Sequence, residues 1–535
     1  DRADVLEENL YTLFREDVEC PSVDLAKPIG ENSALTGYRF LDLLETLYVV
    51  RHLDLEARSL KDRDEGYYTI ASSGHEVNAA VAAALRPTDP AFLHYRSGGF
   101  FVERARQVPG QTPIFDILLS LTASSDDPIS GGRHKVFGSV PLRIYPQTST
   151  IASHFPKAVG HAIALERARR LDLLLPFPDD AIIVCSAGDA SLNHSTALGA
   201  TNAALWESYQ NLPVPILFVC EDNGLGISVT TPSEWIANRW SKQPGLSYFR
   251  ADGLDLAATY DTATQAIQYC RSERAPTFLH LDVVRLLGHA GTDVELAYRD
   301  IGDIKESESR DPLFLNTRQA IKLGLATGAE LDALYEESRN RVHRASRQAA
   351  SHPRLASAEE IIEPLAPYSP AKVRGEAERD DYEDARIDHF GTRTKLPESS
   401  KPRPLTQLLN WGLQDLLSKY PEMLVFGEDV GKRGGVYGVT AQLQKKTSAG
   451  RVFNTLLDEQ SILGMAIGAA QLGLLPVPEI QYLAYYHNAE DQIRGEASTL
   501  QFFSKGQLRN PMVIRIASWG YQRGFGGHFH NDNSI

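Results

Sequence analysis

The sequence AIIVCSAGDA at residues 181–190, followed by PILFVCEDNG at residues 215–224, decides the fold of this chain. Both runs are continuously apolar rather than alternating, which is typical of parallel strands that are covered on both faces. The residues between them, 190–209, suit a crossover helix, so the three segments together predict a βαβ unit. We therefore expect an α/β fold in which parallel sheets carry helices on both faces.

Polar residues follow each of these two strands. Gly188 and Asp189 end the first strand, and Asn223 follows the second strand. Ligands of an open parallel sheet bind beyond the carboxyl ends of its strands, and a βαβ unit can make the two strands neighbours. Converging oxygen side chains suit octahedral Mg²⁺, and the glycine and the helix N-terminus after it offer N–H groups to a diphosphate. Taken singly, both segments are also ordinary turns.

The composition narrows the classes of protein. The chain has 535 residues and a formal net charge of −15. About 150 residues per domain predicts three or four folding units. The acidic balance argues against a nucleic-acid partner, because phosphate backbones need clustered Lys and Arg. We expect no membrane partner, since no apolar run reaches the roughly 20 residues of a span. The four cysteines form no CxxC pair, and reduced thiols fit a cytoplasmic protein.

The pattern changes along the chain in a way that predicts its domains. Residues 1–34 are expected to form a polar arm with one short helix. Helical stretches alternate with short β-rich runs over residues 35–362, and residues 363–404 are rich in proline and charge, as a linker would be. A second α/β pattern covers residues 405–535, including a helix near 489–503. It stops in a polar segment, so we expect this domain to be incomplete.

The two strand ends together resemble the thiamine-diphosphate motif, a GDG triplet followed by an Asn-Asn pair about thirty residues later. The resemblance implies thiamine diphosphate and Mg²⁺ as cofactors. It makes Asp189 and Asn223 side-chain ligands of the metal and Leu225 a backbone-carbonyl ligand. Ala190 replaces the usual second glycine and Asp222 the usual first asparagine, but neither departure removes a ligand.

Flanking segments resemble the α chains of 2-oxoacid dehydrogenases. By this resemblance Tyr95 and Arg96 hold the diphosphate, and a planar guanidinium suits phosphate oxygens. Ile151 wedges the cofactor into its bent form, and His289 faces the diphosphate and the reacting end, where an imidazole suits proton transfer. An exposed pair, a core isoleucine and a surface histidine are the alternatives. The segments are Gly74-His75-Glu76, His94-Tyr95-Arg96, Ile151–Gly160 and Arg285–Asp293.

Residues of the second half resemble the β chains of the same family. Thiamine chemistry needs a buried carboxyl group of raised pKa at the aminopyrimidine ring, and the thiazolium then acts as the electron sink. In Asp458-Glu459-Gln460-Ser461 the second acid, Glu459, is the expected activator, although acids also suit a helix N-terminus. Glu428 matches another β-chain segment, with a structural or relay role.

The end of the sequence resembles the β-chain loop that presents a catalytic histidine. In residues 526–531, GGHFHN, His530 aligns best. It would hold the substrate carboxylate or guide reductive acylation of the lipoyl group. Tyr482, Tyr485 and Tyr486 fall where the family packs an aromatic ring against the pyrimidine. We take Tyr485 as the candidate, although all three could be core residues.

The order of these motifs resembles the decarboxylating component of a 2-oxoacid dehydrogenase complex, with α and β parts fused and the β C-terminal domain missing. This implies two thiamine-diphosphate-binding-fold domains, a diphosphate-binding (PP) domain at 35–362 and a pyrimidine-binding (PYR) domain at 405–535. It also implies a homodimer of fused chains, with the cofactor between the halves across subunits.

The resemblance implies oxidative decarboxylation of a 2-oxoacid and acyl transfer to a lipoyl-bearing dihydrolipoyl acyltransferase. A branched-chain substrate is favoured over pyruvate. A thiamine enzyme without a lipoyl partner, transketolase-like or a synthase, is an alternative, and so is a non-catalytic assembly subunit. The expected catalytic residues are Glu459, His289 and His530; the expected cofactor-binding residues are Tyr95, Arg96, Ile151, Gly188, Asp189, Ala190, Ser191, Asn223, Leu225, His289, Glu459 and Tyr485; the expected metal ligands are Asp189, Asn223 and Leu225.

Overall fold

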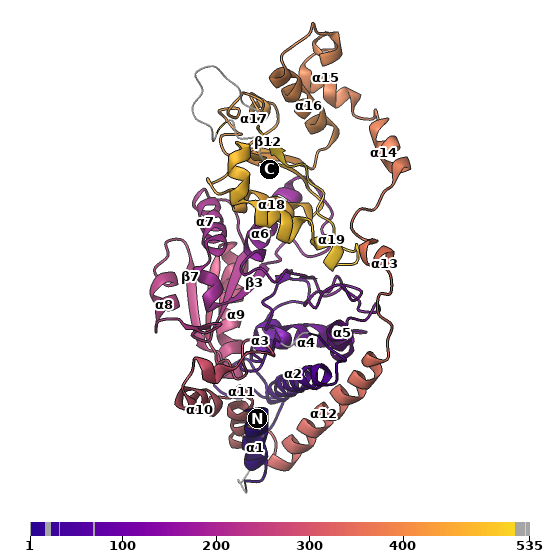
Figure 1. The fold of residues 1–535 in the computed structure, drawn as a ribbon. Helices are drawn as coiled ribbons and strands as arrows, with labels where there is room; N and C mark the ends of the chain where they lie inside the picture. The colour runs from indigo at the N-terminus through magenta and orange to yellow at the C-terminus, as the bar shows by residue number, and fades with distance from the viewer. Residues whose placement is uncertain (1, 17–22, 32, 68–69, 519–529, 531–535) are drawn as a thin grey trace.

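A computed structural model describes residues 2–16, 23–31, 33–67, 70–518 and 530 of the chain. It contains two α/β halves, each built on a parallel sheet that packs against helices (Figure 1). The α/β class predicted from the apolar runs is therefore confirmed. None of the helices in the described part of the chain is both long enough and apolar enough to cross a membrane.

The first half is built on six parallel strands, in the order β2-β1-β3-β4-β8-β7 among the described residues. Strands β3 and β4 pair in register, with Gly188 opposite Glu221, and α7 connects them as the predicted βαβ unit. The strands are β1 (Ala91–Phe92), β2 (Ile144–Tyr145), β3 (Ile183–Gly188), β4 (Ile216–Asp222), β7 (Ser247–Asp252) and β8 (Thr277–Asp282), with a short hairpin of β5 (Leu225–Gly226) and β6 (Val229–Thr230).

The helices of the first half lie on both faces of this sheet. Alternate residues of β3 enter different cores, because successive side chains of a strand point to opposite faces. One core includes side chains of α2, α4, α5 and α9, and the other includes those of α6 and α7. The helices are α1 (Arg2–Phe14), α2 (Gly37–Asp62), α3 (Asn78–Ala84), α4 (Gly98–Arg106), α5 (Pro113–Leu121), α6 (His154–Arg170), α7 (Ser195–Tyr209), α8 (Trp235–Trp240), α9 (Leu256–Glu273), α10 (Ile301–Ser309), α11 (Pro312–Lys322) and α12 (Gly328–Ala350).

The expected polar arm contains a helix that belongs to the core. Leu6, Leu10 and Leu13 recur at helical spacing and are at most 2% exposed in α1. Leu10 and Leu13 pack in one core cluster with residues of α11 and α12, such as Leu313 and Tyr335. This helix is therefore held by apolar burial against the first half.

The second half is a four-stranded parallel sheet in the order β10-β9-β11-β12 among the described residues. The segment expected as a linker, 363–404, contains helices α14 and α15, and it runs along one side of the molecule from α12 towards α16 (Figure 1). The elements are α13 (Ala358–Ile362), α14 (Pro370–Ala377), α15 (Glu383–Phe390), α16 (Leu405–Lys419), β9 (Met423–Gly427), α17 (Leu443–Lys446), β10 (Val452–Asn454), α18 (Glu459–Ala470), β11 (Leu475–Ile480), the 3₁₀ segment η5 (Leu483–Asn488), the π-helical segment η6 (Gln492–Ala497), α19 (Leu500–Phe503) and β12 (Arg515–Ile516).

The single helix predicted near 489–503 is wrong, because the structure divides it into η6 and α19. Contacts with the first half accompany the division. Glu496 of η6 forms a buried ion pair with Lys157, at 2.5 Å between Oε2 and Nζ, and the Gln492 side chain donates to the Ser153 carbonyl at 3.1 Å. Local sequence pattern cannot predict these contacts, because the partner residues belong to the other half of the chain. Short π-helical segments frequently occur at functional sites.

Helices α6 and α18 cross at glycines and join the two halves. A Cβ on Gly160 would lie 2.3 Å from the Cα of Met465, and a Cβ on Gly468 would lie 2.1 Å from the carbonyl oxygen of Lys157. The backbones therefore approach more closely than any side chain permits. One hydrophobic core accordingly continues from α6 through α18 to the second sheet.

We predict opposite effects from the same substitution at two helical glycines. Gly468→Ala should destabilise the protein by about 1–3 kcal/mol, because its methyl group overlaps the backbone of α6. Gly412→Ala in α16 meets no atom within 4 Å and should stabilise it by about 0.5–1 kcal/mol through helix propensity. Thermal unfolding of both variants checks this. If both variants unfolded at a higher temperature than the wild-type protein, the result would contradict the close approach of α6 and α18.

Candidate active site

A pocket of about 580 Å³ lies at the carboxyl ends of the strands of the larger sheet. Most of its described lining comes from segments that follow β1, β2, β3, β4 and β8, and Ile70 with residues 134–137 completes it. This is the position at which open parallel sheets bind ligands. The structure brings together ten residues predicted to bind the cofactor: Tyr95, Arg96, Ile151, Gly188, Asp189, Ala190, Ser191, Asn223, Leu225 and His289.

Oxygen donors gather where β3 and β4 end. Asp189 is 1% exposed, and its carboxylate accepts a hydrogen bond from the Thr231 hydroxyl. Burial, with the neighbouring charge of Asp222, raises the pKa of Asp189 to about 6. The Oδ1 atom of Asn223 accepts the N–H of Leu225 at 3.0 Å. A carboxylate, an amide oxygen and nearby backbone carbonyls are the donor set that Mg²⁺ prefers.

Cationic donors surround the same pocket. Arg96, 3% exposed, donates to the carbonyl of Ala71 at 2.6 Å, and Arg285 donates to the carbonyl of Ile227 at 2.8 Å. The Nε atom of Arg285 and the Nδ1 atom of His94 are buried without a hydrogen-bond partner among the described residues. Buried polar groups normally have a partner, so these atoms fit a site that binds an anion.

His289 is held as a neutral donor. The Arg96 guanidinium donates to its carbonyl at 3.0 Å and contacts its Nδ1 at 3.3 Å. Because a guanidinium can only donate, Nδ1 accepts, and the ring proton lies on Nε2. Burial and the charges of Arg96 and Arg285 lower the pKa of His289 to about 4, which keeps the imidazole neutral at pH 7. The ring can therefore donate one hydrogen bond through Nε2.

Ile151 lines the pocket and is 38% exposed, so it is not the core isoleucine of the alternative interpretation. Sequence reasoning missed the neighbouring loop, in which His134, Lys135 and Phe137 also line the pocket. Burial lowers the pKa of Lys135 to about 8, an effect that nearby carboxylates oppose, and its Nζ lies 3.8 Å from the centre of the Phe137 ring. The sequence signal was only a basic run after two glycines.

The residues expected from the second half gather apart from this pocket. Glu459 begins α18, is half-buried, and accepts a hydrogen bond from the Asn488 amide at 3.4 Å. The more deeply buried carboxyl group beside it is Glu428, whose pKa is raised to about 7 by burial and by neighbouring carboxylates, Glu459 foremost. Neither carboxyl group is part of the described lining of the pocket.

His530 and Tyr485 lie together, with 3.2 Å between the Tyr485 hydroxyl and Nε2 of His530. Tyr482 is 5% exposed and packs edge-on against both rings. The other residues of the predicted histidine loop, 526–529 and 531, lie outside the described part of the chain. The structure therefore places Tyr485 and His530 in one aromatic cluster of the second half, and neither lines the pocket.

Comparison with known proteins also divides the chain into these two halves. Residues 46–358 match the family "Dehydrogenase E1 component", and residues 402–524 match "Transketolase, pyrimidine binding domain". The human pyruvate dehydrogenase E1 component subunit alpha, somatic form, is 25% identical over 347 residues, which cover 63% of this chain and 82% of the relative.

The second half is similar to β subunits. The 2-oxoisovalerate dehydrogenase subunit beta of Pseudomonas aeruginosa is 37% identical over 129 residues, which cover 24% of this chain and 36% of the relative. The pyruvate dehydrogenase E1 component subunit beta of Staphylococcus epidermidis is 40% identical over 126 residues, 24% of this chain and 37% of the relative. The first family match alone spans more than half of the sequence, so the chain belongs to the dehydrogenase E1 component family, with an α-type and a β-type half in one polypeptide.

Proposed function

We propose that this chain binds thiamine diphosphate and Mg²⁺, decarboxylates a 2-oxoacid oxidatively and transfers the acyl group to the lipoyl group of a dihydrolipoyl acyltransferase. The observation that carries the proposal is the pocket at the strand ends, where oxygen donors adjoin buried cationic and imidazole groups. Membership of the dehydrogenase E1 component family supports the same reaction class. A transketolase-like enzyme or a non-catalytic subunit would lack acyl transfer to lipoamide.

The pocket residues divide into two groups. Asp189, Asn223 and the carbonyl of Leu225 would hold Mg²⁺, because all three offer oxygen ligands. Arg96 and Arg285, with the N–H groups after Gly188, would neutralise the diphosphate. When bound, thiamine diphosphate would supply the nucleophilic carbon for the 2-oxo group, and its thiazolium ring would be the electron sink for decarboxylation. The neutral His289, which lines the same pocket, would donate a hydrogen bond beside the diphosphate and the reacting end.

Part of the pocket lining is apolar. Ile70, Val136, Phe137 and Ile151 are among the residues that line it. Apolar walls stabilise a branched aliphatic group through burial, at about 0.8 kcal/mol per CH₂ group. We therefore propose a branched-chain 2-oxoacid as the preferred substrate, with pyruvate as the rival.

The carboxyl group that activates the aminopyrimidine ring would come from the second chain of a homodimer. Glu459 lies outside the described lining of the pocket of its own chain, and it is half-buried at the start of α18. A homodimer in which the α-type half of one chain meets the β-type half of the other would supply Glu459 to the aminopyrimidine ring. Tyr485 and His530, which cluster in the same half, would accompany it.

Removal of one metal ligand should abolish cofactor binding. We expect Asp189→Ala to weaken the metal-dependent binding of thiamine diphosphate by more than about 100-fold, because even outer partners of a metal ligand are typically worth 10–100-fold. Asp222→Asn is the matched control, since it removes a neighbouring negative charge without removing a proposed ligand. Calorimetric titration with Mg²⁺ into the full chain measures both. A folded wild-type protein that binds no cofactor would contradict the proposal.

Loss of the activating carboxyl group should spare binding. Glu459→Gln should retain cofactor affinity and lose about 10²–10⁴-fold in turnover. The control Glu490→Gln, at an exposed position of the same half, should leave both affinity and turnover unchanged. Mixing Asp189→Ala chains with Glu459→Gln chains should restore activity, because a mixed dimer holds one intact site. Steady-state assays with a lipoyl acceptor check this. If the mixture stays inactive although the chains exchange, the site lies within one chain.

The apolar part of the pocket lining predicts a specificity. The ratio kcat/KM should be higher for 3-methyl-2-oxobutanoate than for pyruvate by about 10-fold or more, because two further methyl groups are buried. The same assay without the lipoyl acceptor, and with an aldose acceptor, separates acyl transfer from a transketolase-like reaction. A preference for pyruvate would refute the substrate assignment and leave the reaction class standing.

A further inference from the structure

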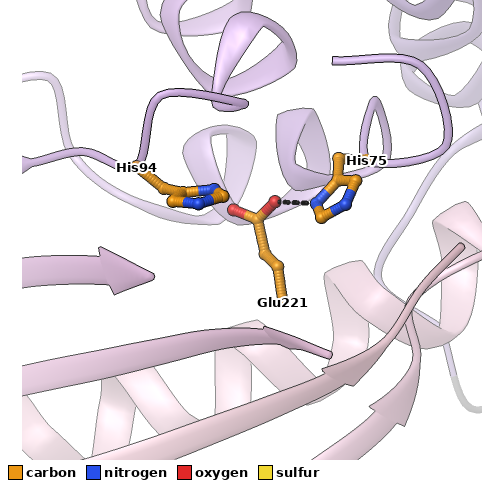
Figure 2. A group of neighbouring side chains, drawn as sticks. All are labelled: His75, His94 and Glu221. Carbon is orange, nitrogen blue, oxygen red and sulfur yellow. Dashed lines mark hydrogen bonds and ion pairs between the residues drawn. The ribbon is translucent and has the colours of Figure 1, made fainter. Parts of the chain in front are cut away.

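Two buried side chains, Glu221 of β4 and His75, form a hydrogen-bonded connection to the proposed metal ligand Asn223. Nδ1 of His75 lies 2.7 Å from Oε2 of Glu221, and Nε2 of His75 lies 3.0 Å from Nδ2 of Asn223. His75 and Glu221 are 0% and 1% exposed. Figure 2 shows the Glu221 carboxylate between two imidazole rings: the His75 ring, to which it is hydrogen-bonded, and the His94 ring on the other side. The connection joins residues that are far apart in the sequence.

The hydrogen-bond partners of His75 determine which of its two ring nitrogens carries the proton. The Glu221 carboxylate already accepts from the Asn78 amide, at 3.2 Å to Oε2, and a carboxylate accepts from Nδ1–H of His75 as well. A neutral imidazole that donates through Nδ1 has only a lone pair on Nε2. That lone pair must meet a donor, which is the NH₂ group of Asn223.

The orientation of the Asn223 amide follows. If the amide were turned over, its oxygen would face the lone pair of His75 Nε2, and two acceptors would meet in a buried site. The NH₂ group is therefore held by His75, and Oδ1 is left with one bond to the N–H of Leu225. A carbonyl oxygen has a second lone pair for a cation.

His75, His94 and Glu221 also lie close enough together to suggest a metal site of their own. The geometry argues against it. A tetrahedral ion about 2.0 Å from each ligand holds neighbouring ligand atoms about 3.3 Å apart. The Nδ1 of His75 and the Oε2 of Glu221 are only 2.7 Å apart, which is the length of a charge-assisted hydrogen bond.

We infer that His75 is a positioning residue. Glu221 accepts a hydrogen bond from Nδ1 of His75, and Nε2 of His75 accepts one from the Asn223 amide, which fixes the orientation of that amide and presents its Oδ1 to Mg²⁺. The inference rests on the proposed function, because it takes Asn223 as a metal ligand. It adds an orienting pair, one member of which lies well before the metal motif in the sequence.

The test measures metal affinity rather than activity. The full chain is titrated with Mn²⁺, a paramagnetic substitute for Mg²⁺, in the presence of thiamine diphosphate, and free Mn²⁺ is followed by electron paramagnetic resonance. His75→Leu should weaken Mn²⁺ binding about 10-fold or more. His75→Gln should recover part of the loss, because its amide oxygen can accept from Asn223. His52→Leu, which alters another buried histidine away from the pocket, should leave the affinity unchanged.

A second substitution separates orientation from general damage. An aspartate at position 223 presents an oxygen whichever way it turns, so it needs no orienting partner. His75→Leu should therefore weaken Mn²⁺ binding in the Asn223 protein but not in the Asn223→Asp protein, and a double-mutant cycle measures this coupling. The comparison also remains informative if the single His75→Leu variant folds poorly, because His75→Phe, which likewise offers no acceptor to Asn223, can replace it in the cycle.

The outcomes are distinct. Equal weakening in both backgrounds, or none in either, overturns the positioning role while the proposed cofactor site stands. Wild-type protein that binds no Mn²⁺ with thiamine diphosphate overturns the proposed function itself, and the inference with it. Weakening confined to the Asn223 background supports the orientation mechanism.

Discussion

The in-register pairing of β3 with β4 is the constraint on which the site depends. It places Gly188 opposite Glu221, so the residues after both strands emerge at one edge of the sheet. Asp189 and Asn223 can then serve one ligand, and Glu221 lies where it can reach His75. A change of register by one residue would move Gly188 away from Glu221 and turn every side chain of a strand to the opposite face, so the pairing that builds the two cores also builds the site.

Burial of polar groups gives the pocket its electrostatic character. Arginine, imidazole, carboxylate and amide groups all line it, and burial lowers the pKa of His289 while it raises that of Asp189. Charged groups that have few solvent molecules around them interact strongly with one another. The protein can tolerate such an arrangement because a diphosphate and a cation would neutralise it, as the proposed function requires.

Much of this arrangement follows from local sequence pattern. The continuous apolar runs predict β3 and β4, and the motifs predict ten of the residues that line the pocket. Strand β7 escapes prediction because its side chains are mostly half-exposed, and η6 because long-range partners such as Lys157 accompany its geometry. The role of His75 escapes too, since its two partners lie far away in sequence. The local sequence pattern indicates the periodicity of apolar residues, whereas these features depend on contacts between residues that are far apart in the sequence.

The linker between the halves, residues 363–404, changes how the molecule responds to dilution. When two associating surfaces are parts of one chain, their encounter takes place at an effective concentration on the order of millimolar, whatever the protein concentration outside. The packing of α6 on α18 is therefore an intramolecular equilibrium, which dilution in the cell or in the test tube leaves untouched. Separate α and β chains would have to be made in matched amounts, whereas this polypeptide delivers the two halves in a fixed one-to-one ratio.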